Sequence, residues 1–210
     1  MKETKGNILK AALKLFNQDG YVNVRLQHIA DEAFVSVGNL AYHFENKQEI
    51  LLALYTQLAQ HQENLLKELN IVPLFEHLDR HWDNAFEIQK AYSFFYIDAL
   101  EVQRSNKDIA DKHHNHIQWQ TQQLRQLLSF NISRGSLRKM NDGTLNGVAD
   151  MLWTYENMWY HQSLVKGLNL EDQNAAKAHL WLIIKPYFTE IGQQEFDQLQ
   201  ELKDITSGVE

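Results

Sequence analysis

Apolar residues recur three and four positions apart along almost the whole chain, and no convincing period-two alternation is present. Only two prolines, Pro73 and Pro186, and nine glycines interrupt this spacing. The pattern predicts an all-α protein. The expected helices span about 5–19, 26–33, 37–44, 47–69, 74–90, 92–105, 109–133, 144–167 and 172–202.

Several residues at the ends of these segments favour the same boundaries. Gly20 is expected at the C-terminal cap of the first helix, and Ser36 at the N-terminal cap of the third. The run from Asn46 to Glu49 is typical of a capping box that opens a long fourth helix. Pro186 should kink or disrupt the last helix, because proline removes a backbone donor.

Composition narrows the class of protein. With 44% hydrophobic and 22% charged residues among 210, the chain is typical of a globular protein with a sizeable core. No apolar run approaches the ~20 residues of a membrane helix, and the N-terminus lacks the apolar centre of a signal peptide. We therefore expect a cytoplasmic protein. The absence of cysteine excludes disulfides, thiolate nucleophiles and sulfur-based zinc sites.

The net charge of −7 is unevenly distributed. Residues 1–60 are neutral, so all of the excess negative charge lies in the remainder. A neutral N-terminal region on an acidic body is compatible with DNA binding by the former, but charge alone does not indicate it.

Two short helices separated by three residues, next to a longer first helix, form the pattern of a helix-turn-helix. On the third helix, Leu40 and Phe44 would face inward, which leaves Gly38, Asn39 and Tyr42 on the outer side. A helix in the major groove needs such a face, because small residues allow close approach and short amides pair with base edges. Asn39 is the best candidate for reading adenine. Tyr42 and His43 have the reach for phosphates or a thymine methyl group, and Lys47 adds a cation for phosphate.

The same residues resemble a known family, the tetracycline-repressor (TetR) type of regulator. The resemblance covers about residues 4–52 and is concentrated in Val35-Ser36-x-Gly38-x-Leu40-x-Tyr42-His43-Phe44-x-Asn46-Lys47. It implies a DNA-binding domain over 1–50 and a helical effector-binding and dimerisation domain over 51–210. It further implies a homodimer that represses at a palindromic operator and is released by a small molecule. We expect no cofactor and no metal. The predicted DNA contacts are Arg25, Val37, Gly38, Asn39, Tyr42, His43 and Lys47.

Three positions depart from the family pattern. Phe34 occupies a usual turn glycine, which predicts an altered or strained turn. Ala41 replaces a usual tyrosine, which should delete one DNA contact. Arg25 and His28 stand where the second helix usually has its capping box, so that helix should lose a cap, although Arg25 gains reach to a phosphate.

The aromatic residues of the C-terminal part suggest a binding site. All five tryptophans lie outside the first 60 residues. Ordinary core packing is one interpretation of these side chains, and an apolar pocket with polar groups at its rim is the other. The residues nominated for such a pocket are Phe95, Trp119, Tyr155 and Trp159.

The helices expected at 144–167 and 172–202 are apolar on two sides. One side would pack on the chain's own core and the other on a second copy, as in a four-helix bundle. The alternative is that both helices are central in a monomer. The residues predicted to face the partner are Trp153, Tyr160, Leu164, Trp181, Ile184 and Phe188.

Other functions have weaker support. Asp98, Glu101 and Glu156 lie among aromatic residues, where a buried carboxylate can do acid–base work, but they form no recognisable catalytic constellation. His77 and His81, and the group His113, His114 and His116, are expected on solvated faces rather than at a metal. A dimeric helical scaffold or ligand-binding protein that has lost DNA binding remains the alternative to a regulator.

Overall fold

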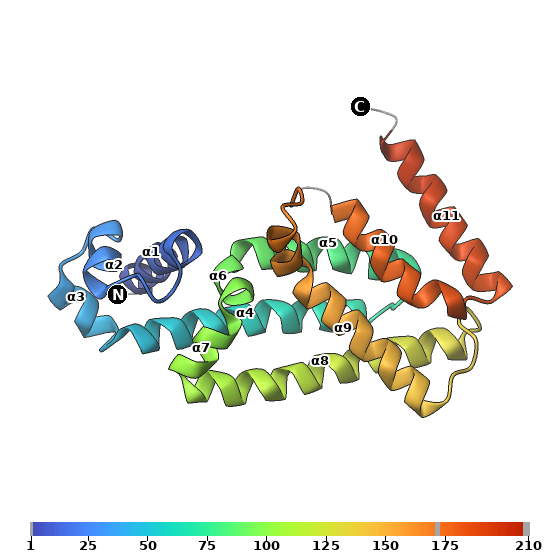
Figure 1. Ribbon diagram of the computed structural model, residues 1–210, viewed down its shortest axis with the longest axis horizontal. Coiled ribbons are helices and arrows are strands. Elements are labelled where there is room, and N and C mark those ends of the chain that lie inside the picture. Colours follow the sequence, from blue (N-terminus) through green and yellow to red (C-terminus); the bar gives the residue numbers. More distant parts are fainter. Residues whose placement is uncertain (1, 171–172, 208–210) are drawn as a thin grey trace. The chain divides into compact units, whose positions relative to one another are not determined.

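The computed structural model describes residues 2–170 and 173–207, and this part of the chain is helical throughout apart from its connections (Figure 1). The predicted all-α fold class is confirmed. The elements are α1 (Lys2–Asp19), α2 (Leu26–Glu32), α3 (Val37–His43), α4 (Lys47–Leu69), α5 (Phe75–Ala91), α6 (Ser93–Ile97), α7 (Ala99–Ser105), α8 (Lys107–Ser133), α9 (Asp142–Val165), α10 (Gln173–Ile184), the 3-10 helix η1 (Lys185–Tyr187) and α11 (Glu190–Ser207).

Two expected helices are each broken in the structure. The segment predicted at 92–105 divides at Asp98, where the backbone leaves helical angles between α6 and α7. Neither proline nor glycine stands at this break. The last predicted helix ends at Ile184 and resumes at Glu190, with Pro186 inside η1. The disruption expected at Pro186 is therefore confirmed, and it produces two separate helices.

The chain divides into two compact units. Unit 1 combines residues 1–62 with 88–116, and unit 2 combines residues 63–87 with 117–210. The long helices α4, α5 and α8 each contribute residues to both units. Unit 1 thus contains the predicted helix-turn-helix together with α6, α7 and the start of α8.

In unit 1, the first helix is held by its apolar face and by one polar side chain. Ile8, Ala12 and Phe16 are buried, and Gly20 ends the helix with φ +77°. The side-chain amide of Asn17 makes two hydrogen bonds to the backbone at the α5–α6 junction. Its Nδ2 donates to the Ala91 carbonyl at 2.9 Å, and its Oδ1 accepts from the Phe94 backbone N–H at 3.1 Å. This clamp fixes the first helix of the DNA-binding region against a segment more than 70 residues away.

Unit 1 also contains a half-buried histidine, His113, that should make the protein sensitive to acid. Burial, aided by the charges of His116 and His114, lowers the pKa of His113 to about 4. The unfolded chain therefore binds a proton near pH 6.5 that the folded chain refuses until about pH 4, so stability falls as pH drops through this window. We expect the wild type to lose about 2 kcal/mol more unfolding free energy than His113→Gln between pH 7 and pH 5.

Urea unfolding at the two pH values measures this difference. His61→Gln is the matched control, because His61 is exposed in the same unit and is not among the groups that lower the pKa of His113, and it should retain the wild-type pH dependence. Equal pH slopes for His113→Gln and the wild type would contradict the prediction.

Unit 2 is built around an aromatic core crossed by a buried ionic network. Trp181 packs against Phe75 and Trp82, with ring centroids 5.1 and 5.0 Å apart. Asp79 of α5 accepts from Trp181 Nε1 at 2.9 Å, from Lys177 Nζ at 3.1 Å and from Lys203 Nζ at 2.7 Å. These hydrogen bonds offset the burial of the Asp79 carboxylate and join α5 to α10 and α11.

The close packing of α11 depends on a glycine. A Cβ at Gly192 would lie 2.1 Å from the Ser136 carbonyl oxygen, so any side chain there would displace the backbone. Close by in sequence, Arg134 Nη2 donates to Glu195 Oε1 at 2.7 Å, and Glu195 Oε1 also accepts from the Phe75 N–H at 3.0 Å. The start of α11 is therefore fixed both to the segment after α8 and to the start of α5.

Candidate nucleic-acid interface

The turn between α2 and α3 is tight and strained. Phe34 has φ +56° and its side chain is 94% exposed. The turn closes through Val35 N–H to Ala30 O at 2.9 Å. A non-glycine residue in the left-handed region costs about 1–2 kcal/mol. The turn therefore forms despite the phenylalanine, and the strain expected at this position is present.

The N-terminal cap and the buried side of α3 together fix which face of the helix is exposed. Ser36 Oγ accepts from the Asn39 N–H at 3.1 Å, as predicted for an N-cap serine. Leu40 and Phe44 are buried, which fixes the helix by its inner side. The opposite side therefore has to face solvent.

Four of the predicted contact residues lie together on this exposed side of α3: Val37, Gly38, Asn39 and Tyr42. Tyr42 is 74% exposed, although its ring also contacts the half-buried His43 edge-on at 5.2 Å. A Cβ at Gly38 would meet Ser36 Oγ at 4.0 Å and nothing closer in the described chain, so internal packing does not require glycine there. The glycine leaves the backbone open to a close approach from outside.

A hollow of about 390 Å³ adjoins these side chains. It is lined by Asn39, Tyr42 and His43 of α3 and by Thr4 of α1. Hydroxyl, amide, phenol and imidazole groups therefore converge on one small surface. Such groups hydrogen-bond both to phosphate oxygens and to base edges. Thr4 had not been predicted from the sequence, because nothing in the spacing of α1 indicates that its first turn meets α3.

Arg25 and His28 form a partial substitute for the expected cap of α2. Arg25 occupies the N-cap position with an extended backbone, and its guanidinium has no acceptor to offer the first turn. His28 Nδ1 instead accepts from the Arg25 N–H at 3.3 Å. The helix therefore lacks a side-chain acceptor at its N-cap, as predicted, whereas His28 keeps the reciprocal bond of the capping box. The exposed Arg25 side chain pairs with no carboxylate in the described residues, so it remains available to phosphate.

Lys47 has a different environment from the one expected. Its Nζ donates to the carbonyls of Tyr21 and Val24, each at 2.8 Å, and to Val22 O at 3.3 Å. It also lies 4.3 Å from the centroid of the Tyr21 ring. Burial lowers the pKa of this ammonium group. All three N–H donors of Lys47 are used inside the protein, so the geometry argues against the phosphate contact predicted for this residue. Its ammonium group instead stabilises the loop before α2.

Removing this ammonium should destabilise the protein without a specific effect on DNA. Lys47→Met keeps the apolar stem but leaves three carbonyls without their donor, which should cost about 1–3 kcal/mol of unfolding free energy. Chemical denaturation measures the loss. Lys10→Met, at an exposed position of α1, is the control and should change stability by less than about 0.5 kcal/mol. A Lys47→Met variant as stable as the wild type would show that the carbonyl contacts contribute nothing.

Two further cations of the N-terminal region have partners within the protein. Lys14 Nζ lies 2.6 Å from Glu32 Oε1, and Lys5 Nζ lies 5.0 Å from the centroid of the Phe44 ring. Three of the six basic residues among positions 1–60 therefore have a partner inside the protein. The surface of α3 is therefore one in which polar and aromatic groups, rather than a dense positive patch, meet a ligand.

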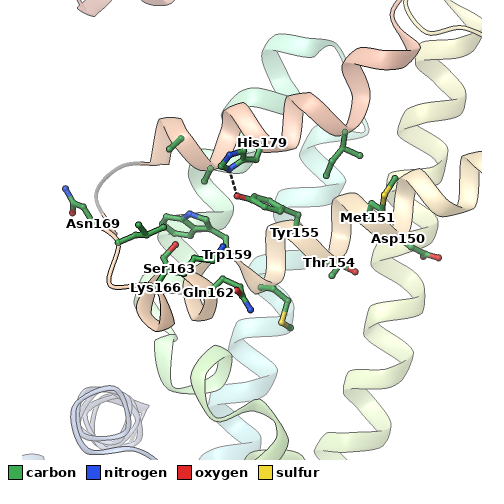
Figure 2. Close-up of a pocket in the computed structure, with 15 residues that line it drawn as sticks. Asp150, Met151, Thr154, Tyr155, Trp159, Gln162, Ser163, Lys166, Asn169 and His179 are labelled. Carbon is green, nitrogen blue, oxygen red and sulfur yellow. Dashed lines mark hydrogen bonds between the residues drawn. The ribbon is translucent and has the colours of Figure 1, made fainter.

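In unit 2, an open groove of about 760 Å³ runs between α9 and α10. Figure 2 shows Tyr155 of α9 and His179 of α10 facing one another across it, joined by a hydrogen bond of 2.7 Å between Oη and Nδ1. Met151, Met158 and Ile183 supply apolar lining. The groove has the size and apolar character of a surface that accepts a partner or a ligand.

The four aromatic residues predicted for a pocket do not come together. Tyr155 and Trp159 both line the groove. Trp119 is half-buried against the core of unit 2 and is not part of the groove lining. Phe95 lies in unit 1, where its ring centroid is 5.0 Å from that of His113. A pocket containing all four is therefore not formed within one unit.

Three of the residues predicted to face a partner are instead buried in the chain's own core. Trp181 is 2% exposed, and Ile184 and Phe188 are buried with it in unit 2. Trp153 is also turned inward, since its Nε1 donates to Gln120 Oε1 at 3.0 Å. The prediction was wrong here because apolar spacing alone does not distinguish a second buried face from a partner-facing one. Of the remaining two, Tyr160 is half-buried and Leu164 is exposed.

A stripe that had not been predicted occupies the outer face of α9. It begins at Met151 and ends at Val165, and its spacing of three or four residues keeps it on one side of the helix. Its members are all exposed: Met151, Thr154, Met158, Gln162 and Val165. The methionine and valine positions are visible in the sequence, but the intervening polar residues hid the stripe.

The three candidate carboxylates do not lie together in one unit. Asp98 and Glu101 lie in unit 1, whereas Glu156 lies in unit 2. His77 and His81 belong to unit 2, and the group at 113–116 belongs to unit 1. In the part of the chain that is described, no three metal-ligating side chains converge. The same part contains no helix long and apolar enough to cross a membrane.

Comparison with known proteins agrees with this architecture. Residues 8–54 match the model of the bacterial regulatory proteins of the tetR family, and residues 57–196 match a second model described as bacterial transcriptional repressor. The chain belongs to the TetR family. The helix-turn-helix DNA-binding domain at its N-terminus and the helical domain that follows are thereby confirmed.

Individual relatives of this TetR-family chain are regulators too. It is 26% identical to the HTH-type transcriptional regulator CymR of Pseudomonas putida over 185 residues, 86% of this chain and 74% of CymR. It is 43% identical to RutR of Escherichia coli K12 over 54 residues, which is 26% of each chain. A TetR-family regulator from Marinobacter aquaeolei VT8 has the same fold, with a TM-score of 0.83 at 19% identity and coverage of 94% and 97%. A gamma-butyrolactone receptor gives a TM-score of 0.70 at 16% identity, with 94% of each chain covered.

Proposed function

We propose that this TetR-family regulator is a repressor that binds a palindromic operator as a homodimer and leaves it when a small molecule binds its helical domain. The observation that carries the proposal is the exposed face of α3. Asn39 and Tyr42 stand on it beside the bare backbone of Gly38, and buried Leu40 holds the helix in place. An amide that reaches a base edge reads adenine bidentately, and Tyr42 has the length to reach a phosphate or a thymine methyl.

The groove between α9 and α10 supports the dimer. The exposed stripe of α9 has Met158 at its centre, with Asp150 and Lys166 as lining residues at equal distances along the chain on either side. If α9 pairs antiparallel with α9 of a second copy about Met158, Asp150 faces the partner's Lys166 at both ends. A two-fold contact requires such self-complementarity. Leu182 of α10 is exposed as well and extends the apolar surface.

Two copies bound in this way place two recognition helices on one DNA. Half-sites of an operator then mirror the two-fold axis of the protein, and a single copy binds weakly. In such a dimer, the two recognition helices can have a spacing that fits the operator or one that does not. An effector acts by binding these two states of the dimer with different affinity. A preference of about 3 kcal/mol for the non-binding spacing weakens DNA binding roughly a hundredfold.

Related structures support a small-molecule effector by analogy. One neighbour, with a TM-score of 0.70, is a gamma-butyrolactone receptor, and another, with a TM-score of 0.63 at 18% identity, is SmeT in complex with triclosan. These names describe those proteins. For this chain they support a helical domain that accepts an organic molecule, and its chemical class has to come from this chain's own residues.

The decisive experiment is selection of bound fragments from the host genome, followed by a gel shift on the recovered sequence. The proposal expects a palindromic fragment that is bound in preference to its scrambled version. Equal retention of both fragments would favour a dimeric scaffold without sequence recognition and would overturn the proposal.

A further inference from the structure

Two buried side chains in the groove between α9 and α10 carry polar atoms that make no hydrogen bond within the described chain. Trp159 is 6% exposed and Ser163 is 2% exposed, and both line the groove. The Ser163 carbonyl accepts from the Leu168 N–H at 2.9 Å, but the Ser163 hydroxyl and Nε1 of Trp159 have no partner among the described residues. Side chains as buried as these normally have their polar atoms paired, so two such donors one turn apart on α9 require an explanation.

The ring of Trp159 is held in place by the core of unit 2. Its centroid lies 4.4 Å from that of Phe86, which is fully buried on α5. The indole N–H groups of Trp153 and Trp181 donate to a glutamine and an aspartate of the same unit. The nitrogen-bearing edge of Trp159 is instead turned towards α10 (Figure 2). The groove therefore has a rigid N–H donor at its buried side, which we call the floor of the groove (Trp159 and Ser163).

The pair formed by Tyr155 and His179 adds a further donor beside this floor. Tyr155 Oη and His179 Nδ1 are 2.7 Å apart, and both residues line the groove. If the phenol donates to Nδ1, the neutral imidazole carries its hydrogen on Nε2, and if Nδ1–H donates, the phenol hydrogen is left over. Each arrangement leaves one N–H or O–H for another acceptor. Both helices of the groove therefore present donors.

The rest of the lining is apolar or carries charges of opposite sign. Its apolar members are Met151, Met158, Leu168, Ala175, Ala176 and Ile183. Its carboxylate is Asp150 and its ammonium group is Lys166. These charges cancel, so the groove does not favour a net charge of either sign. A volume of about 760 Å³ is large enough for a small organic molecule with an apolar body.

We propose that the floor of this groove is the effector site, and that the effector is an uncharged organic carbonyl compound, such as a ketone or an ester. The inference rests on the proposed function and names its ligand chemistry. A carbonyl oxygen has two lone pairs and no hydrogen, so it accepts from N–H and O–H groups without adding a donor that needs its own partner. The apolar remainder of the molecule replaces water along the methionine and alanine side chains.

This site is adjacent to the surface proposed for the second copy. Trp159 and Ser163 each follow a residue of the exposed stripe, Met158 and Gln162, by one position. One position along an α-helix is a rotation of about 100°, so the floor is turned from the stripe around the axis of α9. A ligand on the floor therefore lies at the margin of the contact between the two copies. From there it favours one arrangement of the dimer over another.

Equilibrium dialysis of the full chain against three matched probes tests the chemistry. The probes are 4-phenylbutan-2-one, butylbenzene, in which the carbonyl is a methylene, and 3-phenylpropanoate, in which a charged oxygen replaces the methyl group. We expect the ketone to bind at least about tenfold more tightly than the anion, because a charge loses its hydration in an apolar groove without net charge. The hydrocarbon reports the apolar part of the affinity alone.

Variants locate the donors. Ser163→Ala and Trp159→Phe each remove one hydrogen-bond donor, and each should lower the ratio of ketone affinity to hydrocarbon affinity about threefold to tenfold. The ratio cancels changes in apolar contact, which both probes share. Ser133→Ala and Trp119→Phe remove the same groups outside the groove lining and should retain the wild-type ratio. The melting temperature of each variant shows whether its fold is intact.

The same preparation links the site to DNA. Saturating ketone should weaken binding of the selected operator fragment in the wild type, and the concentrations needed should rise in Ser163→Ala. The inference is overturned by unchanged ratios in both groove variants, by tighter binding of the anion than of the ketone, by no binding of the ketone up to its solubility limit, or by full operator affinity at saturating ketone. Preference for the selected fragment over its scrambled version is measured without any probe. Its loss counts against the proposed function, whereas its presence with any of the four results counts against this inference alone.

Discussion

Met158→Glu should convert the protein to monomers and abolish specific operator binding. In the proposed antiparallel pairing, the two copies of residue 158 meet at the two-fold axis, so the substitution buries two carboxylates against each other. An unpaired buried charge costs about 3–5 kcal/mol, which weakens the dimer at least about hundredfold. Sedimentation velocity measures the oligomer and fluorescence anisotropy measures operator affinity. Gln126→Glu, at an exposed position of α8, is the control and should leave both unchanged.

Charge reversal at the ends of the same stripe tests the register. Lys166→Glu places like charges opposite each other in the proposed pairing and should weaken the dimer, whereas the double variant Asp150→Lys with Lys166→Glu should restore it. Rescue by the double variant is expected only if these two residues face each other across the axis. A wild-type chain that sediments as a monomer at micromolar concentration would contradict the dimer altogether.

Asn39→Ala and Tyr42→Ala should each weaken operator binding by about 1–3 kcal/mol, while the fold and the dimer survive. Both side chains are exposed on α3, so their loss removes contacts to DNA and little internal packing. Asn39→Ala should also relax the preference for one base pair of each half-site. Fluorescence anisotropy on the selected operator and on its single-base variants measures both effects.

Arg25→Ala provides a contrast within the same experiment. It should weaken binding to all DNA sequences alike, because a phosphate contact carries no base information. It should also reduce the slope of log affinity against log salt concentration by about one. Gln18→Ala, at an exposed position of α1, serves as the control. Unchanged affinity in Tyr42→Ala would show that α3 does not enter the groove as proposed.

Local chemistry made several features predictable. The cap at Ser36 and the C-terminal glycine of α1 in the N-terminal region, and the break at Pro186 near the C-terminus, each follow from one residue and its neighbours. The role of Lys47 was not predictable, because its carbonyl partners lie 23 to 26 residues away along the chain. Sequence spacing placed a cation at the start of α4, but only the fold shows that Tyr21 and Val24 use it.

In the C-terminal part, the sequence does not show which apolar helix faces are buried in the chain's own core and which remain exposed. Trp181 looked like an interface residue because it stands on a helix that is apolar on more than one side. In the structure its indole N–H is bound to Asp79 of α5, a contact across 102 residues. Conversely, Met151 and Met158 lie among polar residues and were overlooked, although they form the exposed surface. Helical periodicity gives the faces of a helix, but the packing of distant segments decides which of them remains open.

The Asn17 clamp has a consequence for recombining regulators of this kind. Its amide joins α1 to Ala91 and Phe94, so the DNA-reading module is discontinuous in sequence and includes residues 88–116. A chimaera that joins residues 1–50 of this protein to the helical domain of another regulator would confront Asn17 with foreign backbone. Operator specificity should therefore be transferred intact when both segments are exchanged together, and a cut at residue 50 should yield poorly folded hybrids. A functional exchange therefore has to include both of these remote segments, because the contact between them, and not a single boundary along the chain, defines the part that can be transferred.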